Sequence, residues 1–326
     1  MTIGDNLRNR EAAPGRDLSY PPLPEALTVG VYDNHTHLDH ATDSGNRVAE
    51  GEELTYREQL DRASSVGIRG VVQVGTDLET SRWSAEIAAV EPRVLAAVSI
   101  HPNEAPGYEA SGKLDAAIEE LDQLAQQARV RAIGETGLDF FRTEEGGRGA
   151  QYKSFEAHIE LAKKHNLALQ IHDRDAHSEV VKTLQRVGAP ERTVFHCFSG
   201  DEEFARVCAD NGWYMSFAGT VTFKNAQPLR DALEIIPPHL ILVETDAPYL
   251  TPTPYRGRPN ASYLIPLTMR AMAIARGTDV SMLAALVSTN TEQVYGMWDS
   301  QPVTEPIQVF DRPELGTFDH PTRIGE

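Results

Sequence analysis

Six side chains that commonly bind metal ions lie at the ends of short apolar runs in this chain. They are four histidines and two acids, namely His35, His37, His172, His196, Glu135 and Asp246. Imidazole nitrogens and carboxylate oxygens suit Zn²⁺, Mn²⁺, Fe²⁺ or Co²⁺, and Mg²⁺ where carboxylates, water and phosphate dominate. Six such ligands exceed the needs of one tetrahedral ion, so they predict two divalent ions that share a carboxylate. Such an ion pair lowers the pKa of bound water and stabilises a leaving oxygen, which predicts a hydrolase.

Each of these signals is weak when taken alone. A bare His-x-His pair such as His35 and His37 is as often two ordinary polar residues in a loop. A histidine after an apolar strand is usually a hydrogen-bonded structural residue, and a lone carboxylate there can cap the next helix. The coincidence of six candidates at five strand ends favours a metal site, whereas the identity of the metal is left open.

Eight short apolar or β-branched runs alternate with longer amphipathic stretches. The runs predict strands at residues 29–33, 70–74, 94–100, 131–135, 168–172, 193–197, 213–217 and 240–245, and the longer stretches predict helices at 54–66, 78–90, 113–128, 150–165, 176–187, 201–211, 227–235, 263–276 and 281–287. Regular alternation predicts right-handed βαβ units and a parallel sheet. Eight units favour a closed (β/α)8 TIM barrel over an open doubly wound sheet. Barrel enzymes build their sites from the carboxyl ends of the strands, where the six candidates lie.

The barrel accounts for one domain, residues 29–296. Residues 1–28 are rich in Asn, Arg and Pro without helical or strand periodicity, which predicts a flexible N-terminal extension. Residues 297–326 contain four prolines and six acids against two arginines, which predicts an acidic tail that lies on the surface or is disordered. The sequence contains no internal repeat and no Gly-x-Gly-x-x-Gly or Walker-type loop, so no nucleotide cofactor is expected.

The composition is that of a strongly acidic globular protein. Of 326 residues, 40% are hydrophobic and 24% are charged, which excludes a disordered or low-complexity chain. The net charge of −18 argues against broad electrostatic affinity for nucleic acid or anionic lipid. Two cysteines without a Cys-x-x-Cys pattern indicate a reducing compartment. Together with the lack of a long apolar run and of a signal-peptide core, this predicts a cytoplasmic protein that is not in the membrane.

Five short motifs resemble the signatures of TatD-type metal-dependent deoxyribonucleases. They are HTHLD at residues 35–39, IGETGLD at 133–139, IHDRDA at 171–176, FHCFSG at 195–200 and ETDAPYL at 244–250. Two further stretches resemble the same family, SFAGTVTFKNA at 216–226 and PYRGRPN at 254–260. The likeness spans about residues 29–296, and the order and approximate spacing of the motifs match as well.

The resemblance implies a TIM-barrel hydrolase of the amidohydrolase type that acts on DNA, often as a 3′-to-5′ exonuclease. The ligand sets that it implies are His35, His37 and Asp246 for one ion, His172 and His196 for the other, and a bridging Glu135. Asp246 would also accept a proton from the attacking water. The chain departs from the family at Asn103, where many relatives carry a second histidine.

A DNA substrate needs local positive charge around the site of an acidic protein. Two divalent ions would outweigh the charge of Glu135 and Asp246, the two carboxylates among the predicted ligands. Substrate contacts are predicted for side chains that follow strand ends, namely His101, Arg174, Lys224, Tyr255 and Arg256. A guanidinium suits phosphate and an aromatic face can stack on a base, whereas Phe140, Phe141 and Phe223 are interpreted as barrel packing. For the histidine in this set, a backbone hydrogen bond in its loop is the alternative.

Three functions are consistent with these features. The leading hypothesis is a metal-dependent deoxyribonuclease that removes nucleotides from DNA ends or single strands by means of two-metal-activated water. The same ions could open an ester or amide, as in a D-aminoacyl-tRNA deacylase, because phosphoryl and acyl centres can use the same ligands. The third is a metal-bound scaffold whose acidic tail recruits a partner, although a scaffold would not require all six ligand positions. The sequence specifies neither protein partners nor the oligomeric state.

Overall fold

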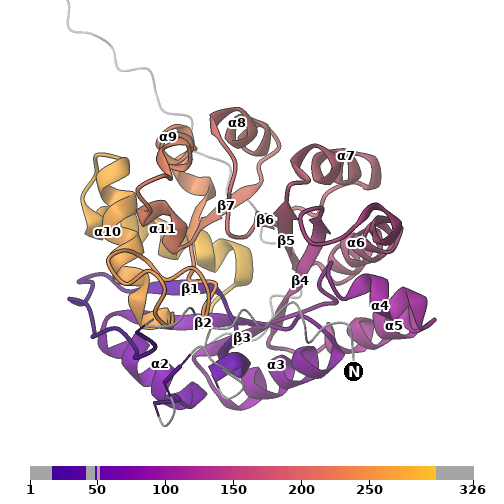
Figure 1. Ribbon diagram of the computed structural model, residues 1–326, viewed down its shortest axis with the longest axis horizontal. Coiled ribbons are helices and arrows are strands. Elements are labelled where there is room, and N and C mark those ends of the chain that lie inside the picture. Colours follow the sequence, from indigo (N-terminus) through magenta and orange to yellow (C-terminus); the bar gives the residue numbers. More distant parts are fainter. Residues whose placement is uncertain (1–16, 42–47, 50–51, 299–326) are drawn as a thin grey trace, which may run out of the picture.

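Eight parallel strands form the centre of the protein in the computed structural model, which describes residues 17–41, 48–49 and 52–298. The strands are β1 (Val31–Thr36), β2 (Ile68–Val74), β3 (Val94–Val98), β4 (Val130–Asp139), β5 (Ala168–Arg174), β6 (Thr193–Phe195), β7 (Tyr214–Phe217) and β8 (Ile241–Val243). Each strand pairs with the next one along the chain. Figure 1 shows the strands inside a ring of helices. The predicted (β/α)8 barrel is confirmed.

The ring of strands closes between β1 and β8 at the carboxyl ends. The backbone amide of Asp246 donates to the carbonyl of His35 at 2.9 Å, and the amide of His37 donates to the carbonyl of Ala247 at 2.9 Å. The side-chain amide of Asn34 adds a hydrogen bond of 2.7 Å to a β8 carbonyl. The contacts that close the barrel therefore also fix the backbone of three predicted metal ligands.

Alternating apolar residues give each strand two buried faces. Along β3, Val94, Ala96 and Val98 pack outward with the helices, whereas Leu95 and Ala97 pack in a second cluster inside the barrel. Successive side chains on a strand point to opposite faces, so one strand serves both clusters. This explains the near-continuous apolar runs of the sequence, which are expected for a parallel sheet that is covered by helices.

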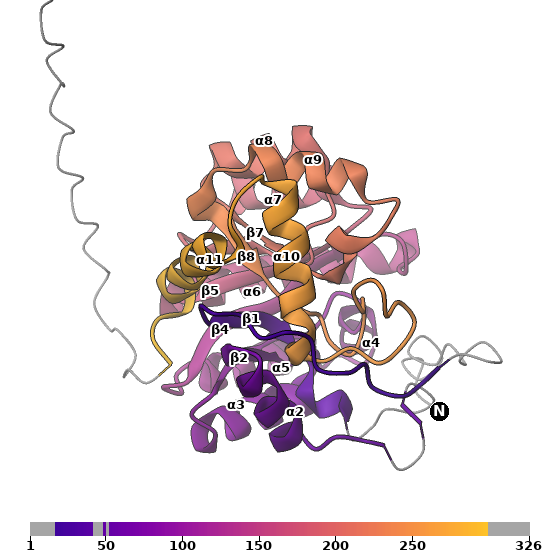
Figure 2. The same ribbon diagram turned by 90° about the vertical axis from the view of Figure 1, so that its left-hand side faces the viewer.

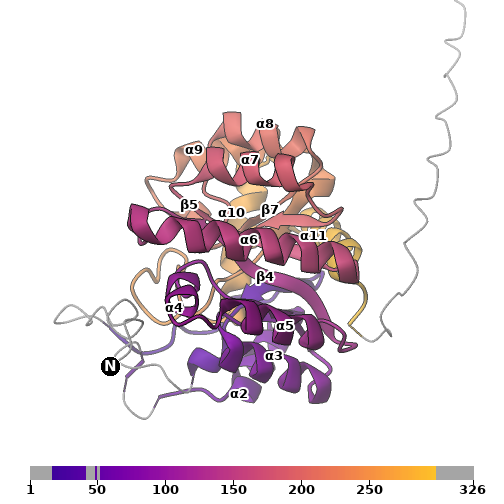
Figure 3. The ribbon, with the colours of Figure 1, turned by 90° about the vertical axis from the view of Figure 1, so that its right-hand side faces the viewer.

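Helices cover the outside of the barrel. They are α2 (Tyr56–Ser65), α3 (Leu78–Val90), α4 (Ala105–Ala110), α5 (Leu114–Leu124), α6 (Glu145–His165), α7 (His177–Val187), α8 (Glu202–Asp210), α9 (Gln227–Ile235), α10 (Ile265–Ala275) and α11 (Val280–Tyr295). The last two, α10 and α11, pack on β8 beside β1 (Figure 2), and α6 lies between α5 and α7 (Figure 3). Within the described ranges no single helix is long and apolar enough to cross a membrane, and only the bent pair at Ser262–Ala275 and Val280–Tyr295 passes that test together.

The predicted elements differ from the observed ones at strand ends and most of all at the helix predicted for 281–287, because α11 continues to Tyr295. The helices predicted at 78–90 and 227–235 coincide with α3 and α9. In contrast, β1, β4 and β5 each run two to four residues further than predicted, into the polar residues of the motifs. The sequence also does not predict α4, because Pro106 and Gly107 near its start favour a loop.

The segment before β1 is described from Asp17 onward, and there it contacts the barrel. The guanidinium of Arg258 donates to the carbonyls of Ser19 and Tyr20 at 3.0 and 2.8 Å, and the hydroxyl of Tyr263 donates to the carbonyl of Pro21 at 2.6 Å. Residues 1–16 and 299–326 lie outside the described residues. The boundaries of the flexible extension at 1–28, the barrel at 29–296 and the acidic tail at 297–326 stay predictions.

Candidate metal centre

The six predicted metal ligands meet at the carboxyl end of the barrel. They come from β1 (His35 and, just after it, His37), β4 (Glu135), β5 (His172), the end of β6 (His196) and the residues after β8 (Asp246). Together with His101, their nitrogen and oxygen atoms form three overlapping groups, and within each group all atoms lie within 4.8 Å of one another. The groups are His35 with Glu135 and His196, His35 with His37 and Asp246, and His101 with Glu135 and His172.

Two irregularities in the sheet aim the central side chains into this site. The pairing register shifts on β1 between residues 33 and 36, and on β4 between residues 133 and 136. Each shift brackets one predicted ligand, His35 or Glu135. An extra residue in one strand re-aims the side chains beside it, which is why such shifts are frequent next to active sites.

One oxygen of Glu135 faces the first set of ligands. Its Oε1 lies 3.7 Å from Nε2 of His35 and 3.5 Å from Nε2 of His37. The Oδ1 of Asp246 lies 3.8 and 3.6 Å from the same two nitrogens, which are themselves 3.3 Å apart. Both carboxylate oxygens therefore lie next to the same two histidine nitrogens, and we call these four side chains the first half of the site.

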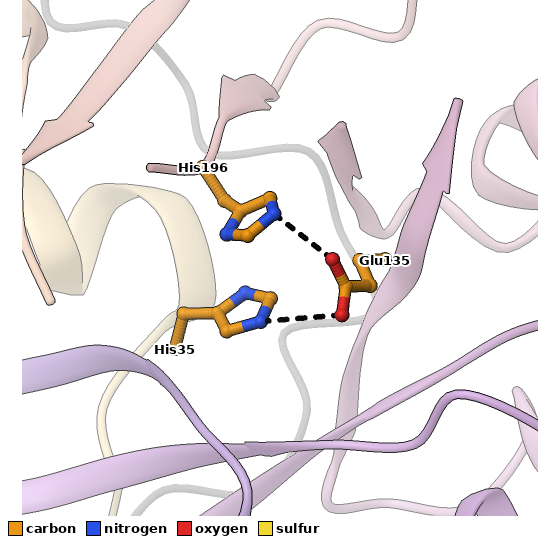
Figure 4. Close-up of side chains that lie close together, drawn as sticks. All are labelled: His35, Glu135 and His196. Carbon is orange, nitrogen blue, oxygen red and sulfur yellow. Dashed lines mark ion pairs between the residues drawn. The ribbon is translucent and has the colours of Figure 1, made fainter. Parts of the chain in front are cut away.

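The other oxygen of Glu135 faces a different set. Its Oε2 lies 2.9 Å from Nε2 of His196, 3.2 Å from Nδ1 of His172 and 3.6 Å from Nε2 of His101. Figure 4 shows the rings of His35 and His196 reaching the carboxylate from two sides, one at each oxygen. We call the Oε2 side the second half of the site.

His101 is placed as a hydrogen-bond donor rather than as a ligand. The backbone amide of Asn103 donates to its Nδ1 at 3.0 Å, so this nitrogen carries the lone pair of the neutral ring. The hydrogen is then on Nε2, which faces Glu135. Burial lowers the pKa of His101 to about 3, which keeps the ring neutral. Both contacts predicted for His101 occur together. Its Nδ1 makes the backbone hydrogen bond in the loop, and its Nε2 faces the site.

The electrostatics of the site favour added positive charge. Burial alone would raise the pKa of Glu135, but the surrounding imidazoles, chiefly those of His101 and His196, hold it well below its usual range. Burial would lower the pKa of His37, yet its contacts with Asp246 and Glu135 raise it well above the ordinary value. Buried carboxylates that stay ionised while drawing protons onto nearby rings are typical of groups that can hold a metal cation instead.

The donor set fits divalent cations. The Nδ1 of His37 lies 2.9 Å from the carbonyl of Val74, so its Nε2 faces Glu135 and Asp246. A divalent cation would take the place of the proton that these two carboxylates hold on Nε2, and it would offset their negative charge. In addition, the buried Nδ1 of His35 has no hydrogen-bond partner among the described residues. The roles of the six residues as metal ligands stay a prediction that this geometry supports.

Sequence reasoning did not assign roles to three buried carboxylates beside the site, Asp33, Asp139 and Glu244. All three are 0% exposed, although they lie within or next to the recognised motifs. Asp139 lies 3.2 Å from Nε2 of His172, and Glu244 lies 3.3 Å from Nδ1 of His196. Asp139 could have been predicted from strand alternation, because residues 135, 137 and 139 of one strand point to the same side. This requires that β4 continue beyond its predicted end at Glu135.

The predicted substrate-contact residues lie further out along the strand ends. Arg174 ends β5, and its guanidinium stacks 4.0 Å from the ring centre of Phe141. Arg256 stacks in the same way on Phe223 at 3.9 Å. The interpretation of Phe141 as barrel packing is wrong, because this side chain is 56% exposed. The guanidinium above it replaces the apolar neighbours that packing would require.

The other two predicted contacts lie in the loops that follow β7 and β8. Lys224 is exposed, and Tyr255 is half-buried with the guanidinium of Arg258 5.4 Å from its ring. Within the described residues, no hydrogen bond or ion pair joins Lys224, Tyr255 or Arg256 to the six ligand residues. The structure therefore brings His101 into contact with the site. Lys224, Tyr255 and Arg256 follow strand ends on the same side of the barrel but make no such bond to the six ligand residues in the described part of the chain.

Comparisons with known proteins match the same part of the chain. The model of the TatD-related DNase family matches residues 32–296. The uncharacterized metal-dependent hydrolase TatD of Mycobacterium tuberculosis is 40% identical over 274 residues, which cover 82% of this chain and 98% of that protein. The 3′-5′ ssDNA/RNA exonuclease TatD of Escherichia fergusonii is 33% identical over 248 residues, which cover 73% of this chain and 92% of that protein.

A solved structure shows the same likeness in three dimensions. The crystal structure of YjjV, a TatD homologue from Escherichia coli K12, superposes with a TM-score of 0.72 at 26% identity and covers 82% of this chain and 98% of that one. The residues that the family model matches include all six candidate ligands. The chain therefore belongs to the TatD family of metal-dependent hydrolases.

Proposed function

We propose that this protein is a deoxyribonuclease that removes nucleotides from the 3′ ends of DNA, acting on strand ends or single strands with two divalent cations, Mg²⁺, Mn²⁺ or Zn²⁺. The observation that carries the proposal is the arrangement around Glu135, whose two oxygens face two separate ligand sets. One carboxylate between two such sets is the arrangement expected of a two-cation hydrolase. A relative named as a 3′-5′ ssDNA/RNA exonuclease supports a nucleic-acid substrate. A cytoplasmic location, predicted from composition, is part of the proposal.

The ligands of the proposed cations divide at the bridging carboxylate. The first half would use His35, His37 and Asp246, the second half would use His172 and His196, and Glu135 would serve both, because its Oε1 faces the first set and its Oε2 the second. When bound, divalent cations at such a site lower the pKa of water and neutralise charge on a phosphate. This chemistry suits a phosphodiester, whose hydrolysis needs an activated water and stabilisation of the leaving oxygen.

The protein's own side chains supply the proton transfers. Asp246 is the more exposed carboxylate of the two, at 15% of its side chain against 6% for Glu135, and it accepts the proton of the attacking water at its free oxygen. His101 is neutral with its hydrogen on Nε2, so it donates a hydrogen bond to the oxygen on which charge develops. Neither step requires a histidine that carries a positive charge.

Substrate position is set by the arginines around the site. The guanidinium carbons of Arg174 and Arg256 lie over phenylalanine rings, so these contacts hold the two charged groups in place before a phosphate arrives. Neither guanidinium has an ion pair with an acid within the described residues, in contrast to Arg258, which pairs with Asp17 at 3.2 Å. Lys224 and Tyr255 complete the proposed contacts with the strand. Local positive charge of this kind offsets the net charge of −18.

The experiment that tests the proposal measures shortening of a 3′-labelled single-stranded oligonucleotide by metal-stripped protein to which Mg²⁺, Mn²⁺ or Zn²⁺ is restored separately. We expect stepwise shortening that requires the cation and disappears in His172→Ala and in Glu135→Gln. Glu156→Gln, the same change at an acid that pairs with Arg186 on the outer helices, should retain activity.

Two results would contradict the proposal. Retained turnover in Glu135→Gln would remove the bridging role. If the protein binds the cations but shortens the oligonucleotide with none of the three, its substrate is not a DNA strand end. A parallel assay on a D-aminoacyl-tRNA then tests whether the same site opens an ester bond.

A further inference from the structure

Three buried carboxylates beside the candidate metal centre have no role in the chemistry described above. Asp33, Asp139 and Glu244 are each 0% exposed. Burying an ionised carboxylate is costly unless charged or hydrogen-bonding partners compensate for it. Their partners therefore indicate what each of them does.

Asp139 and Glu244 lie directly behind the two histidines of the second half. The Oδ2 of Asp139 lies 3.2 Å from Nε2 of His172, so that ring keeps its hydrogen at the back and directs the lone pair of Nδ1 toward Glu135. The Oε1 of Glu244 lies 3.3 Å from Nδ1 of His196, which likewise directs the lone pair of Nε2 forward. A carboxylate behind a histidine fixes its tautomer and raises its basicity as a ligand.

Both supporting carboxylates are themselves held by other groups of the chain. Asp139 accepts from the backbone amide of Arg142 at 2.8 Å and from the side-chain amide of Asn103 at 3.1 Å. Glu244 accepts from the backbone amide of Cys197 at 2.7 Å. Asp139 has two donors besides His172, and Glu244 has one besides His196, so each carboxylate can orient its histidine ring before any cation binds.

Asp33 supports the first half in a different way. It accepts from the hydroxyl and the amide of Thr245 at 2.5 and 2.9 Å, and from the amide of His35 at 3.3 Å. It thereby ties the strand that carries His35 to the residue that precedes Asp246. The Nδ1 of His37 meets the backbone carbonyl of Val74 at 2.9 Å, whereas the histidines of the second half each meet a carboxylate.

We propose that the two halves of the centre are built by separate positioning residues, Asp139 and Glu244 for the second and Asp33 for the first. Each cation can then be lost without the other. This inference rests on the two-cation centre of the proposed function, and it assigns positioning rather than catalytic roles to three residues.

The test counts bound cations and requires no turnover. Mn²⁺ retained after gel filtration is measured by elemental analysis, and electron paramagnetic resonance distinguishes a coupled pair of ions from a single one. The wild type should hold two equivalents as a coupled pair. Asp139→Asn and Glu244→Gln should each weaken one equivalent by about 10- to 100-fold and abolish the coupled signal. Asp122→Asn, which removes a carboxylate 2.7 Å from His165 on the outer helices, should change neither.

Double variants identify which cation is lost. Asp139→Asn combined with His172→Ala should retain one equivalent, because both changes empty the same half. Asp33→Asn combined with His172→Ala should retain none. Asn103→Ala serves as a milder variant if Asp139→Asn folds poorly, because it removes only one donor to Asp139. It should weaken binding of the second cation by several-fold.

Three outcomes would overturn the inference. The first is a coupled pair in Asp139→Asn and Glu244→Gln with dissociation constants within about twofold of the wild type. The second is loss of the same cation from Asp33→Asn as from His172→Ala. The third is a wild type that holds a single equivalent. Phosphodiester hydrolysis by the wild type is recorded separately, so failure of the proposed function is distinguished from failure of this inference.

Discussion

At the scale of single residues, His101 shows how a hydrogen bond outside the site determines what a ring does inside it. The amide of Asn103 occupies one nitrogen and leaves the other to donate toward Glu135. Asn103 stands where many relatives were expected to carry a histidine, and here its side chain supports Asp139 as well. The asparagine at position 103 therefore changes which groups hold Asp139 in place, while His101 still donates toward Glu135.

We predict that His101→Ala lowers kcat on a single-stranded oligonucleotide by about 100-fold, because a donor that meets developing charge is lost. KM should change much less. The pKa of His101 is about 3, so this ring does not titrate between pH 5.5 and 9, and the shape of the pH–rate profile should be the same in the variant. Profiles of kcat for both proteins check this. Loss of the acid limb in the variant would mean that His101 does change its protonation state.

The six candidate ligands could be predicted from the sequence because their residue types are rare after apolar strands. Asp139 and Glu244 could not, for a physical reason. The glycine at position 137 favours a turn, so β4 is predicted to end at Glu135 rather than at Asp139. A carboxylate that contacts a histidine from behind also has no spacing rule, because the two residues belong to different strands.

At the scale of elements, β4 and β5 approach each other more closely than a side chain at Gly137 would allow. This residue has φ of +137°, and a Cβ there would lie 2.1 Å from the carbonyl oxygen of His172. The close approach holds the backbone of His172 against the strand that carries Glu135. Strand pairing thus sets the spacing of the second half of the site.

Gly137→Ala should destabilise the protein by about 1–3 kcal/mol, which corresponds to a melting temperature lower by several degrees, and it should weaken cation binding by displacing His172. Gly149→Ala is the matched control, because this glycine lies inside α6 with open space around it. It should stabilise the protein by about 0.5–1 kcal/mol. Thermal unfolding of both variants checks the pair, and a stability for Gly137→Ala equal to that of the wild type would refute the close approach.

The carboxyl end of β5 and the segment that follows β8 carry the two arginines that lie over phenylalanine rings. Arg174→Ala and Arg256→Ala should each weaken binding of a single-stranded phosphorothioate oligonucleotide and reduce the salt dependence of log K by about 0.7, the value for one phosphate contact. Arg186→Ala removes the same charge at the end of α7, which leads back to the opposite end of the barrel, and should leave the slope unchanged. Fluorescence anisotropy at several salt concentrations measures the slopes. If the wild type and the three variants have equal slopes of log K against log salt concentration, neither Arg174 nor Arg256 contacts a phosphate.

At the scale of the whole molecule, the buried side chain of His158 links helix α6 to the barrel, and its hydrogen bonds require a neutral ring. His158 on α6 is 0% exposed, accepts from the amide of Ile100 at 3.0 Å and donates from Nδ1 to the carbonyl of Ser154 at 2.7 Å. Burial lowers its pKa to about 4, well below the usual value for an exposed histidine. The unfolded chain therefore binds a proton at this residue at a higher pH than the folded chain does.

The sign of the resulting pH dependence follows directly. The stability contributed by neutral His158 is fully present above about pH 6.5 and is lost as pH falls from there toward 4, because the unfolded state then binds more protons. About 2 kcal/mol should be lost between pH 7 and pH 5. His158→Gln, which can still accept from Ile100 but does not titrate, should be less stable than the wild type at pH 7, and the gap should narrow by that amount at pH 5. Urea unfolding of metal-free protein at both pH values checks this, and a gap that stays constant would show that His158 is not the group that couples folding to acid.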